Sequence, residues 1–151
     1  QINSKRNIYP AQVAIAEACG DVRLSTTSRD SGLASIGSDE SGIPVVAIRL
    51  EQFITDIRRK SSDTGKIFLK IDVEGLEYNV VKGLEATIRY RYIEFVFIEL
   101  GVGRTIGRSA ARSGHDLIYD IMERSGYRSI YPIDRSTVYD QLFVLEPRNG
   151  S

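Results

Sequence analysis

The spacing of hydrophobic residues in the first half of the chain predicts strands followed by a helix. Apolar and polar residues alternate over residues 22–26, which is typical of a half-buried strand, and residues 45–48 form a short β-branched run. Hydrophobic residues within 50–57 then recur at i, i+3, i+4 and i+7, the spacing of an amphipathic helix. Basic residues at 58–60 suit the negative end of the helix dipole, so we expect the last turn of the helix there.

The second half of the chain predicts a regular alternation of strands and helices. Residues 67–73 (IFLKIDV) are almost continuously apolar, as expected of a central parallel strand that is covered on both faces. Helical spacing follows over residues 76–88, a second buried strand over 93–100 (IEFVFIEL), and another helical stripe over 117–122. Ser125 and Gly126 come directly after that stripe and are typical of the end of a helix.

The end of the chain predicts two closing strands, at residues 127–133 and 141–145, with a turn at 134–140 between them. Because no helix separates these strands, we expect an antiparallel hairpin at the edge of the sheet. Strands that alternate with helices indicate an α/β fold with a mainly parallel sheet. Residues 28–42, where Ser, Gly and Asp crowd together, are interpreted as a loop or a weakly paired hairpin.

Length and composition indicate one ordinary globular domain over residues 1–151. The chain has 151 residues, with 20 basic side chains, 20 acidic side chains and one cysteine, Cys19. The balanced charge argues against a general nucleic-acid or membrane-surface binder, and no apolar run approaches the roughly 18 residues that cross a bilayer. A lone cysteine excludes an internal disulfide framework and a cysteine-built zinc site, so we expect a cytoplasmic protein.

The first candidate site lies where the strand of residues 67–73 ends. In open α/β sheets, ligands bind beyond the carboxyl ends of the strands, and Asp72 and Glu74 fall at such an end. A carboxylate there is costly to bury without a partner, so it can accept hydrogen bonds from a ligand, coordinate a hard cation or act as a base. The alternative is that one of the two carboxylates only caps the helix that follows.

The same region resembles a known family. IFLKIDVEGLEYNVVKGLEATI, followed by FVFIEL, is similar to the middle of an FkbM-type methyltransferase domain, whose pattern runs K-I-D-x-E-G-x-E, then V-L-x-G, then a strand that ends in Glu. The matching residues are Lys70, Ile71, Asp72, Glu74, Gly75, Glu77, Val80, Val81, Gly83 and Glu99. The resemblance covers roughly residues 8–146 and is most specific over residues 67–83.

This resemblance implies a three-layer, Rossmann-like class I fold and an S-adenosylmethionine-dependent O-methyltransferase. Its acceptors would be small molecules, namely hydroxyls of sugars, glycolipids or natural products. The resemblance places Ala14 and Ile15 near the adenine of the cofactor, and Asp72 and Glu74 at the reaction centre as candidate catalytic residues. It also places Glu99 on the same rim, as a candidate substrate-binding residue.

The chain departs from the family pattern at its beginning. The family starts with a strand that ends in a D-x-G-A-N-x-G loop, and a second strand that ends in an acidic residue for the ribose. No glycine precedes Ala14, and a βαβ unit needs about 30 residues. We therefore expect an N-terminally truncated domain that lacks its first strands and, by itself, binds the cofactor poorly.

The stretch after residue 100 adds further candidate binding residues. Arg104 and Arg108 lie in or beside a glycine-rich loop and can bind a phosphate or carboxylate of a substrate, and His115, the only histidine, can act as an acid or base. The alternative for the arginines is a solvated loop, and the alternative for His115 is a surface position at the start of a helix.

Two other functions stay open. Gly101, Gly103 and Gly107 imitate a dinucleotide-binding loop, although the third glycine is one residue late for G-x-G-x-x-G. Alternatively, the chain is a non-catalytic domain whose sheet edge, exposed by the missing strands, pairs with a second copy or a partner. The tyrosines are scattered and do not form a platform on which nucleic-acid bases stack.

Overall fold

The computed structural model describes the backbone of residues 8–16, 18–26, 34–37, 42–60, 65–73, 76–100, 108–131 and 140–147. It describes the side chains of the same residues except 26, 34–37 and 108–113. The chain divides into two compact units, Gln1–Ile48 and Arg49–Ser151, which we call unit 1 and unit 2 and describe separately. No helix in the described part of the chain is long and apolar enough to span a membrane.

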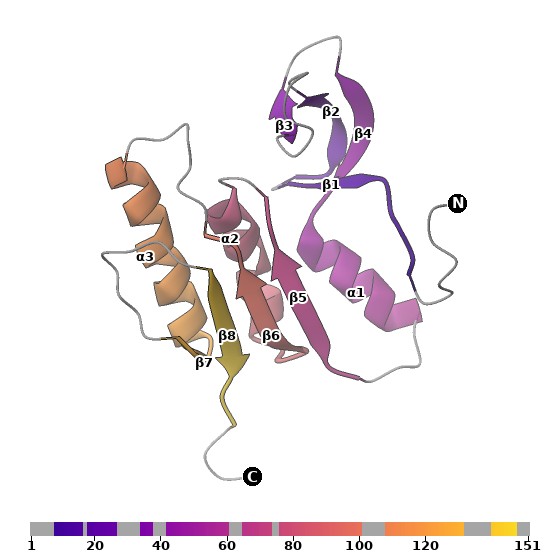
Figure 1. Cartoon of the computed structure of the whole chain (residues 1–151). Helices are drawn as coiled ribbons and strands as arrows, with labels where there is room; N and C mark the ends of the chain where they lie inside the picture. Colours follow the sequence, from indigo (N-terminus) through magenta and orange to yellow (C-terminus); the bar gives the residue numbers. More distant parts are fainter. Residues whose placement is uncertain are drawn as a thin grey trace. The chain divides into compact units, whose positions relative to one another are not determined.

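Unit 1 is built on a four-stranded sheet with the order β1-β4-β2-β3 (Figure 1). Its strands are β1 (Val13–Ile15), β2 (Gly20–Thr26), β3 (Ala34–Gly37) and β4 (Ile43–Ile48). β4 pairs in parallel with β1, whereas β2 is antiparallel to both β3 and β4. The strands predicted at residues 22–26 and 45–48 are confirmed, and β3 lies inside the stretch 28–42, where a weakly paired hairpin was one of two interpretations.

The core of unit 1 is small. Among its described side chains, Ala14, Val45 and Ala47 are buried together, and Val22 and Leu24 pack against them as partly buried neighbours. The alternation of residues 22–26 explains this arrangement, since every second side chain of a strand points to the same face.

Unit 2 combines three helices with a second four-stranded sheet of order β5-β6-β8-β7 (Figure 1). Its elements are α1 (Leu50–Lys60), β5 (Ile67–Ile71), α2 (Glu77–Ile88), β6 (Ile93–Ile98), α3 (Arg108–Arg124), β7 (Tyr127–Ser129) and β8 (Gln141–Leu145). The α/β class and the antiparallel edge hairpin of β7 and β8 are confirmed.

The sheet of unit 2 is mixed, and a mainly parallel sheet stays a prediction. The pairing of β5 with β6 is parallel, whereas β8 lies between β6 and β7 and is antiparallel to both. The hydrophobic pattern of the sequence shows which segments form strands but not their order in the sheet. Because β8 lies between β6 and β7, one of the three described strand pairings is parallel and two are antiparallel.

One face of this sheet is buried and the other is open. On the buried face, Val96, Ile98 and Phe143 are each 0% exposed and face the layer of α2 and α3 (Figure 1). On the other face Phe68 is 61% exposed and has the ring of Phe95 as its neighbour, with 6.1 Å between ring centroids. The described helices therefore cover one face, and the third layer stays a prediction.

β5 also differs from the central strand that its sequence predicted. It is the terminal strand of the unit 2 sheet, with β6 as its paired neighbour, and Phe68 and Lys70 on its open face are exposed. A continuous apolar run indicates a strand, but it does not show that both faces of the strand are buried. Apolar side chains also form much of the exposed surface of folded proteins.

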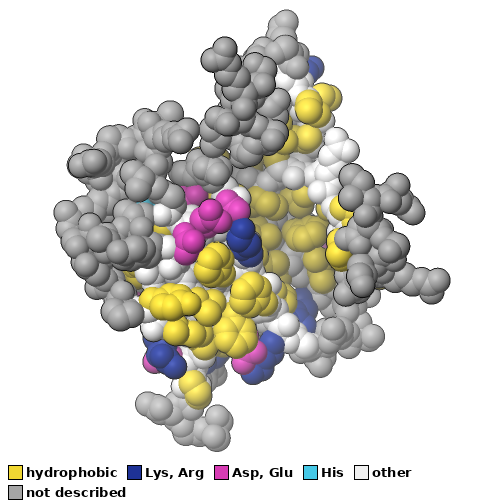
Figure 2. Space-filling model, in the orientation of Figure 1, with side chains coloured by type: hydrophobic (Ala, Val, Ile, Leu, Met, Phe, Trp, Pro, Cys, Tyr) yellow, Lys and Arg dark blue, Asp and Glu magenta, His cyan; other side chains and the backbone are white. Residues whose placement is uncertain are grey.

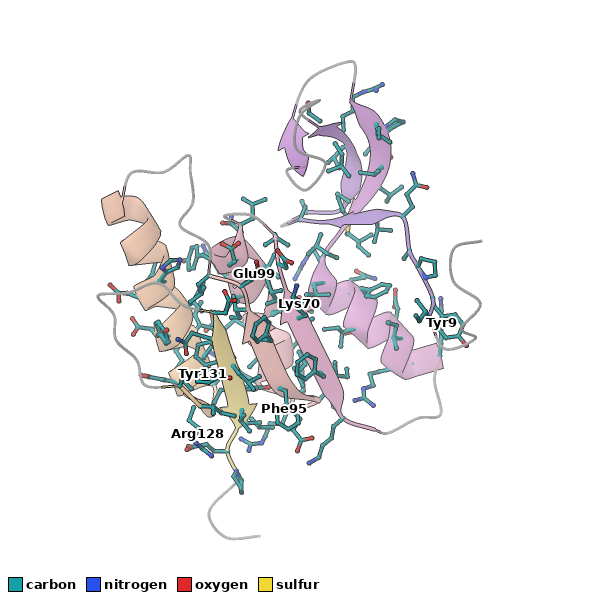
Figure 3. All side chains as sticks on the ribbon, viewed as in Figure 1. Tyr9, Lys70, Phe95, Glu99, Arg128 and Tyr131 are labelled. Atoms are coloured by element: carbon teal, nitrogen blue, oxygen red, sulfur yellow. The ribbon has the colours of Figure 1, made fainter. Side chains whose placement is uncertain are left out.

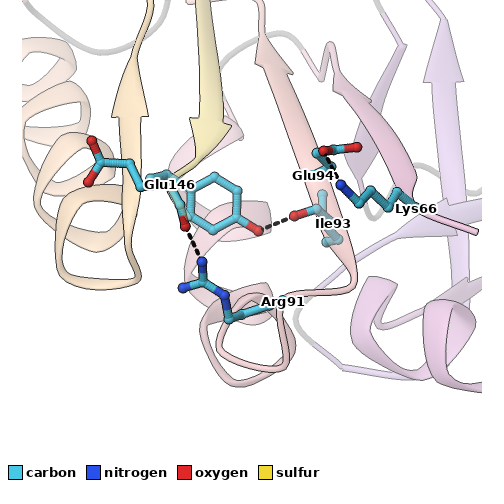
Figure 4. A network of polar contacts seen from close by, with 6 residues as sticks. Lys66, Arg91, Ile93, Glu94 and Glu146 are labelled. Carbon is cyan, nitrogen blue, oxygen red and sulfur yellow. Dashed lines mark hydrogen bonds and ion pairs between the residues drawn. The ribbon is translucent and has the colours of Figure 1, made fainter. Parts of the chain in front are cut away.

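The amino-terminal ends of β5 and β6 are held by a polar network (Figure 4). The buried Tyr127 hydroxyl donates a hydrogen bond to the Ile93 carbonyl, and Arg91, whose φ is 60°, donates to the carbonyl of Glu146. Lys66 pairs with Glu94 at the same end. These contacts join β5, β6, β7 and β8 at one end of the strands. The carboxyl ends of β5 and β6 lie at the opposite end of the sheet.

Candidate active site

The candidate site lies at the carboxyl ends of β5 and β6, which meet at one edge because the two strands are parallel. Ile71 of β5 pairs in register with Ile98 of β6, so the residues that follow them, Asp72 and Glu99, leave the sheet side by side. The Glu99 backbone N–H donates to the Ile71 carbonyl at 3.0 Å and ties the two strand ends together. Adjacent strand ends thus present two carboxylates on the same rim, as the sequence predicted for Asp72 and Glu99.

A lysine joins these two carboxylates. The Lys70 ammonium lies 2.7 Å from Oδ2 of Asp72 and 3.4 Å from Oε2 of Glu99 (Figure 3). Lys70 and Asp72 are two residues apart on an extended chain, so their side chains project to the same face. We call these three side chains the Lys70 cluster.

The electrostatics of the cluster favour its charged form. The hydrogen bond from Lys70 is the main cause that lowers the pKa of Asp72, against a smaller opposing effect of burial. The same hydrogen bond to Asp72 raises the pKa of Lys70. At neutral pH, Asp72 is therefore a carboxylate and Lys70 an ammonium.

The cluster is open to solvent. The side chains of Lys70, Asp72 and Glu99 are 52%, 39% and 45% exposed, respectively. Ion pairs with this exposure add little to the stability of a fold. An exposed carboxylate that is held in its charged form is instead suited to accept a hydrogen bond from a ligand that reaches the rim.

The donor set at the rim suits hydroxyl-bearing or charged organic ligands. Asp72 and Glu99 offer carboxylate oxygens as acceptors, and Lys70 offers a cationic donor between them. In the part of the chain that the structure describes, no three His, Cys, Asp or Glu side chains lie together in a way that would hold a metal ion.

Several predicted site residues lie outside this geometry. Glu74, Arg104 and the glycine-rich loop 101–107 fall outside the described residues, and so do the side chains of Arg108 and residues 109–113. Arg108 is the first residue of α3. The helix therefore begins before the apolar stripe at residues 117–122 from which it was predicted.

His115 lies on α3 and is half-buried. Burial is the main cause that lowers its pKa, whereas the negative charges of Glu77 and Asp116 oppose that effect. Glu77 begins α2 and is 4% exposed. The role of His115 in binding a substrate stays a prediction.

The two predicted cofactor contacts belong to unit 1. Ala14 is buried in the small core beside Val45 and Ala47, and Ile15 is half-buried and pairs in register with Ile48 of β4. Their contact with a cofactor stays a prediction.

Sequence reasoning gave Lys70 no role of its own. Its spacing from Asp72 was a usable signal, since residues i and i+2 of a strand share a face. The contact with Glu99 was not accessible in the same way, because it depends on the register between β5 and β6.

Comparison with known proteins shows the family of the chain. The carboxylates at the ends of β5 and β6 lie where α/β proteins commonly bind their ligands. A family model described as the Methyltransferase FkbM domain matches residues 3–129. The chain therefore belongs to the FkbM methyltransferase domain family. Searches of curated proteins and of solved structures gave no significant match.

Proposed function

We propose that the protein is an S-adenosylmethionine-dependent O-methyltransferase that acts on a small-molecule hydroxyl, in a sugar, a glycolipid or a natural product. Membership of the methyltransferase family supports the reaction class. The observation that carries the proposal for this chain is the ionised Asp72 at the carboxyl end of β5, held by Lys70 at 2.7 Å. A cytoplasmic location is part of the proposal and is supported by the balanced charge and the single cysteine.

The chain's own residues would act on the acceptor. S-adenosylmethionine, when bound, supplies the methyl group of its sulfonium. An Asp72 carboxylate oxygen accepts a hydrogen bond from the acceptor hydroxyl and orients its oxygen for in-line attack. As the new O–C bond forms, the bond between the methyl carbon and the sulfonium sulfur would break and a neutral thioether would leave. Asp72 would take the hydroxyl proton, so the acceptor gains a methyl group and the carboxylate becomes neutral. Glu99, on the neighbouring strand end, is placed to bind a second hydroxyl of the acceptor.

The test measures cofactor binding and methyl transfer separately. S-adenosylmethionine is titrated calorimetrically into the chain and into the longest natural form of the protein that contains it, and transfer of a labelled methyl group is followed with a panel of hydroxyl acceptors. Asp72→Asn should leave cofactor binding unchanged and reduce transfer by about 10²–10⁴-fold, the range of a general base. The matched control is Asp120→Asn, which changes an exposed aspartate on α3.

Two results would contradict the proposal. The first is a longest natural form that does not bind S-adenosylmethionine. The second is an Asp72→Asn variant that transfers methyl groups as fast as the Asp120→Asn control.

A second candidate function, association with another copy, is favoured by the open face of the unit 2 sheet. Figure 2 shows hydrophobic side chains gathered over this sheet. Phe68 is 61% exposed there, and Phe95, Phe97, Leu142 and Val144 are half-buried on the same face. β5 also offers a strand edge to a further strand. Light scattering at high concentration distinguishes the cases, because a strictly monomeric protein would contradict self-association.

A further inference from the structure

Two lysines in or next to β5 make ion pairs of different kinds, and the difference points to a role for one of them. Lys66 precedes the strand and pairs with Glu94 at the amino-terminal end of β6, in the structural network of Figure 4. Lys70 contacts two carboxylates, Asp72 at 2.7 Å and Glu99 at 3.4 Å, at the end of the sheet where ligands bind (Figure 3).

The plain explanation for both lysines is protection of a sheet edge. β5 is the terminal strand of its sheet, and lysines on edge strands discourage pairing with other chains. That explanation accounts for the exposure of both side chains. It does not account for a lysine that contacts two carboxylates at once, as Lys70 does, because an edge lysine needs no acidic partner.

The contact of Lys70 with both carboxylates changes the net charge of the Lys70 cluster. Asp72 and Glu99 lie on adjacent strand ends, and the ammonium between them leaves one net negative charge. Without the ammonium, two carboxylates would lie on neighbouring strand ends with no cation between them. Nearby like charges favour the protonated form of one of the two groups. The described charged side chains that act on Asp72 are Lys70, from its own strand, and Glu99, from the neighbouring strand end.

We propose that Lys70 is a positioning residue for Asp72: its ammonium fixes the Asp72 carboxylate beside Glu99, so that the two carboxylates receive the acceptor as one unit. This inference rests on the proposed function for its catalytic meaning, but its physical content concerns only Lys70, Asp72 and Glu99. The positioning role of the lysine is exerted through Asp72 and not by contact with the methyl group.

The first test follows the ionisation of Asp72 by carboxyl ¹³C NMR. The wild type is compared with Lys70→Met, Lys70→Arg and the matched control Lys66→Met, and the Asp72 resonance is assigned from its loss in Asp72→Asn. We expect the titration midpoint of Asp72 to move upward in Lys70→Met and to stay at the wild-type value in Lys66→Met. Lys70→Arg should restore much of the shift, because a guanidinium also binds two carboxylate oxygens.

The inference is overturned if the Asp72 midpoint in Lys70→Met equals that of the wild type, or if Lys66→Met moves it by the same amount. This measurement needs neither cofactor nor acceptor. Its failure would leave the proposed methyl transfer standing, whereas a lack of methyl transfer would leave the NMR result intact.

The second test separates positioning from binding. With an active acceptor, Lys70→Met should lower kcat by about 10-fold or more, because misplacement of a reacting group by about 1 Å can cost 10²-fold. Affinity for S-adenosylmethionine should not change, and Lys70→Arg should recover most of the lost rate. An unchanged kcat in Lys70→Met would overturn the positioning role.

Discussion

Tyr127 is the buried side chain whose single polar atom joins two strands of the unit 2 sheet. Its hydroxyl donates to the carbonyl of Ile93, and the residue is 2% exposed. Tyr127→Phe leaves that carbonyl without this donor, so we expect a loss of about 1–3 kcal/mol in the free energy of unfolding. Urea denaturation at neutral pH measures the loss. The control Tyr90→Phe removes an exposed hydroxyl and should change stability by less than about 0.5 kcal/mol.

The same tyrosine predicts a pH dependence in the alkaline range. Burial is the main cause that raises the pKa of Tyr127 from 10.0 to about 12. Because the folded pKa is the higher one, the stabilisation is complete below pH 10 and is lost as the pH rises toward 12. The wild type should lose stability more steeply than Tyr127→Phe over this window, since the other tyrosines titrate in both proteins. Equal alkaline slopes in the two proteins would contradict the assignment.

At the scale of elements, the two faces of the unit 2 sheet should differ sharply in their tolerance of substitution. Phe143 in β8 is 0% exposed and meets the ring of Tyr119 on α3, with 5.5 Å between centroids. Phe143→Ala should cost about 3–5 kcal/mol, the range of a buried aromatic residue. Phe68→Ala makes the same change at a side chain that is 61% exposed and should cost no more than about 1 kcal/mol. Equal losses in chemical denaturation would mean that the open face is covered.

The same elements show what the sequence could and could not predict. Leu50, Phe53, Ile54 and Ile57 predicted α1 because a helical stripe is a local property of the chain. The start of α3 at Arg108 was missed because residues 108–116 carry few apolar residues, so the sequence has no apolar stripe there. The sheet order was also inaccessible, since the insertion of β8 beside β6 depends on pairing between distant segments.

The candidate site divides in the same way. Asp72 was predicted because it follows a strand and ligands bind at the carboxyl ends of parallel strands, and Glu99 was placed on the same rim by the family resemblance. The bridge by Lys70 was not predicted, because its contact with Glu99 follows from the register of β5 and β6 and not from the sequence around either residue. The sequence thus indicated the acidic residues of the rim. The contact that joins Lys70 to Glu99 depends on the long-range pairing of β5 with β6.

For the whole molecule, the match to the methyltransferase family extends over residues 3–129 and so includes parts of both units, yet their described cores differ greatly. In unit 1 the cluster of buried hydrophobic side chains consists of Ala14, Val45 and Ala47 among the described residues. In unit 2, β6 is paired on both sides, by β5 and β8, and carries Ile93, Val96 and Ile98 at 0% exposure. Local stability follows buried apolar contact, so these differences set an order of opening.

Hydrogen exchange of the native protein measures that order residue by residue. Amides of β6 should have the highest protection factors in the chain, because they exchange only when most of the unit 2 core opens. Amides of β2 and β4 should exchange with clearly lower protection, since few buried side chains hold their sheet. The comparison uses protection factors, so that differences in intrinsic exchange rates cancel, and it uses conditions in which reclosing is faster than exchange. If β4 were protected as strongly as β6, unit 1 would owe its stability to contacts beyond its own described core.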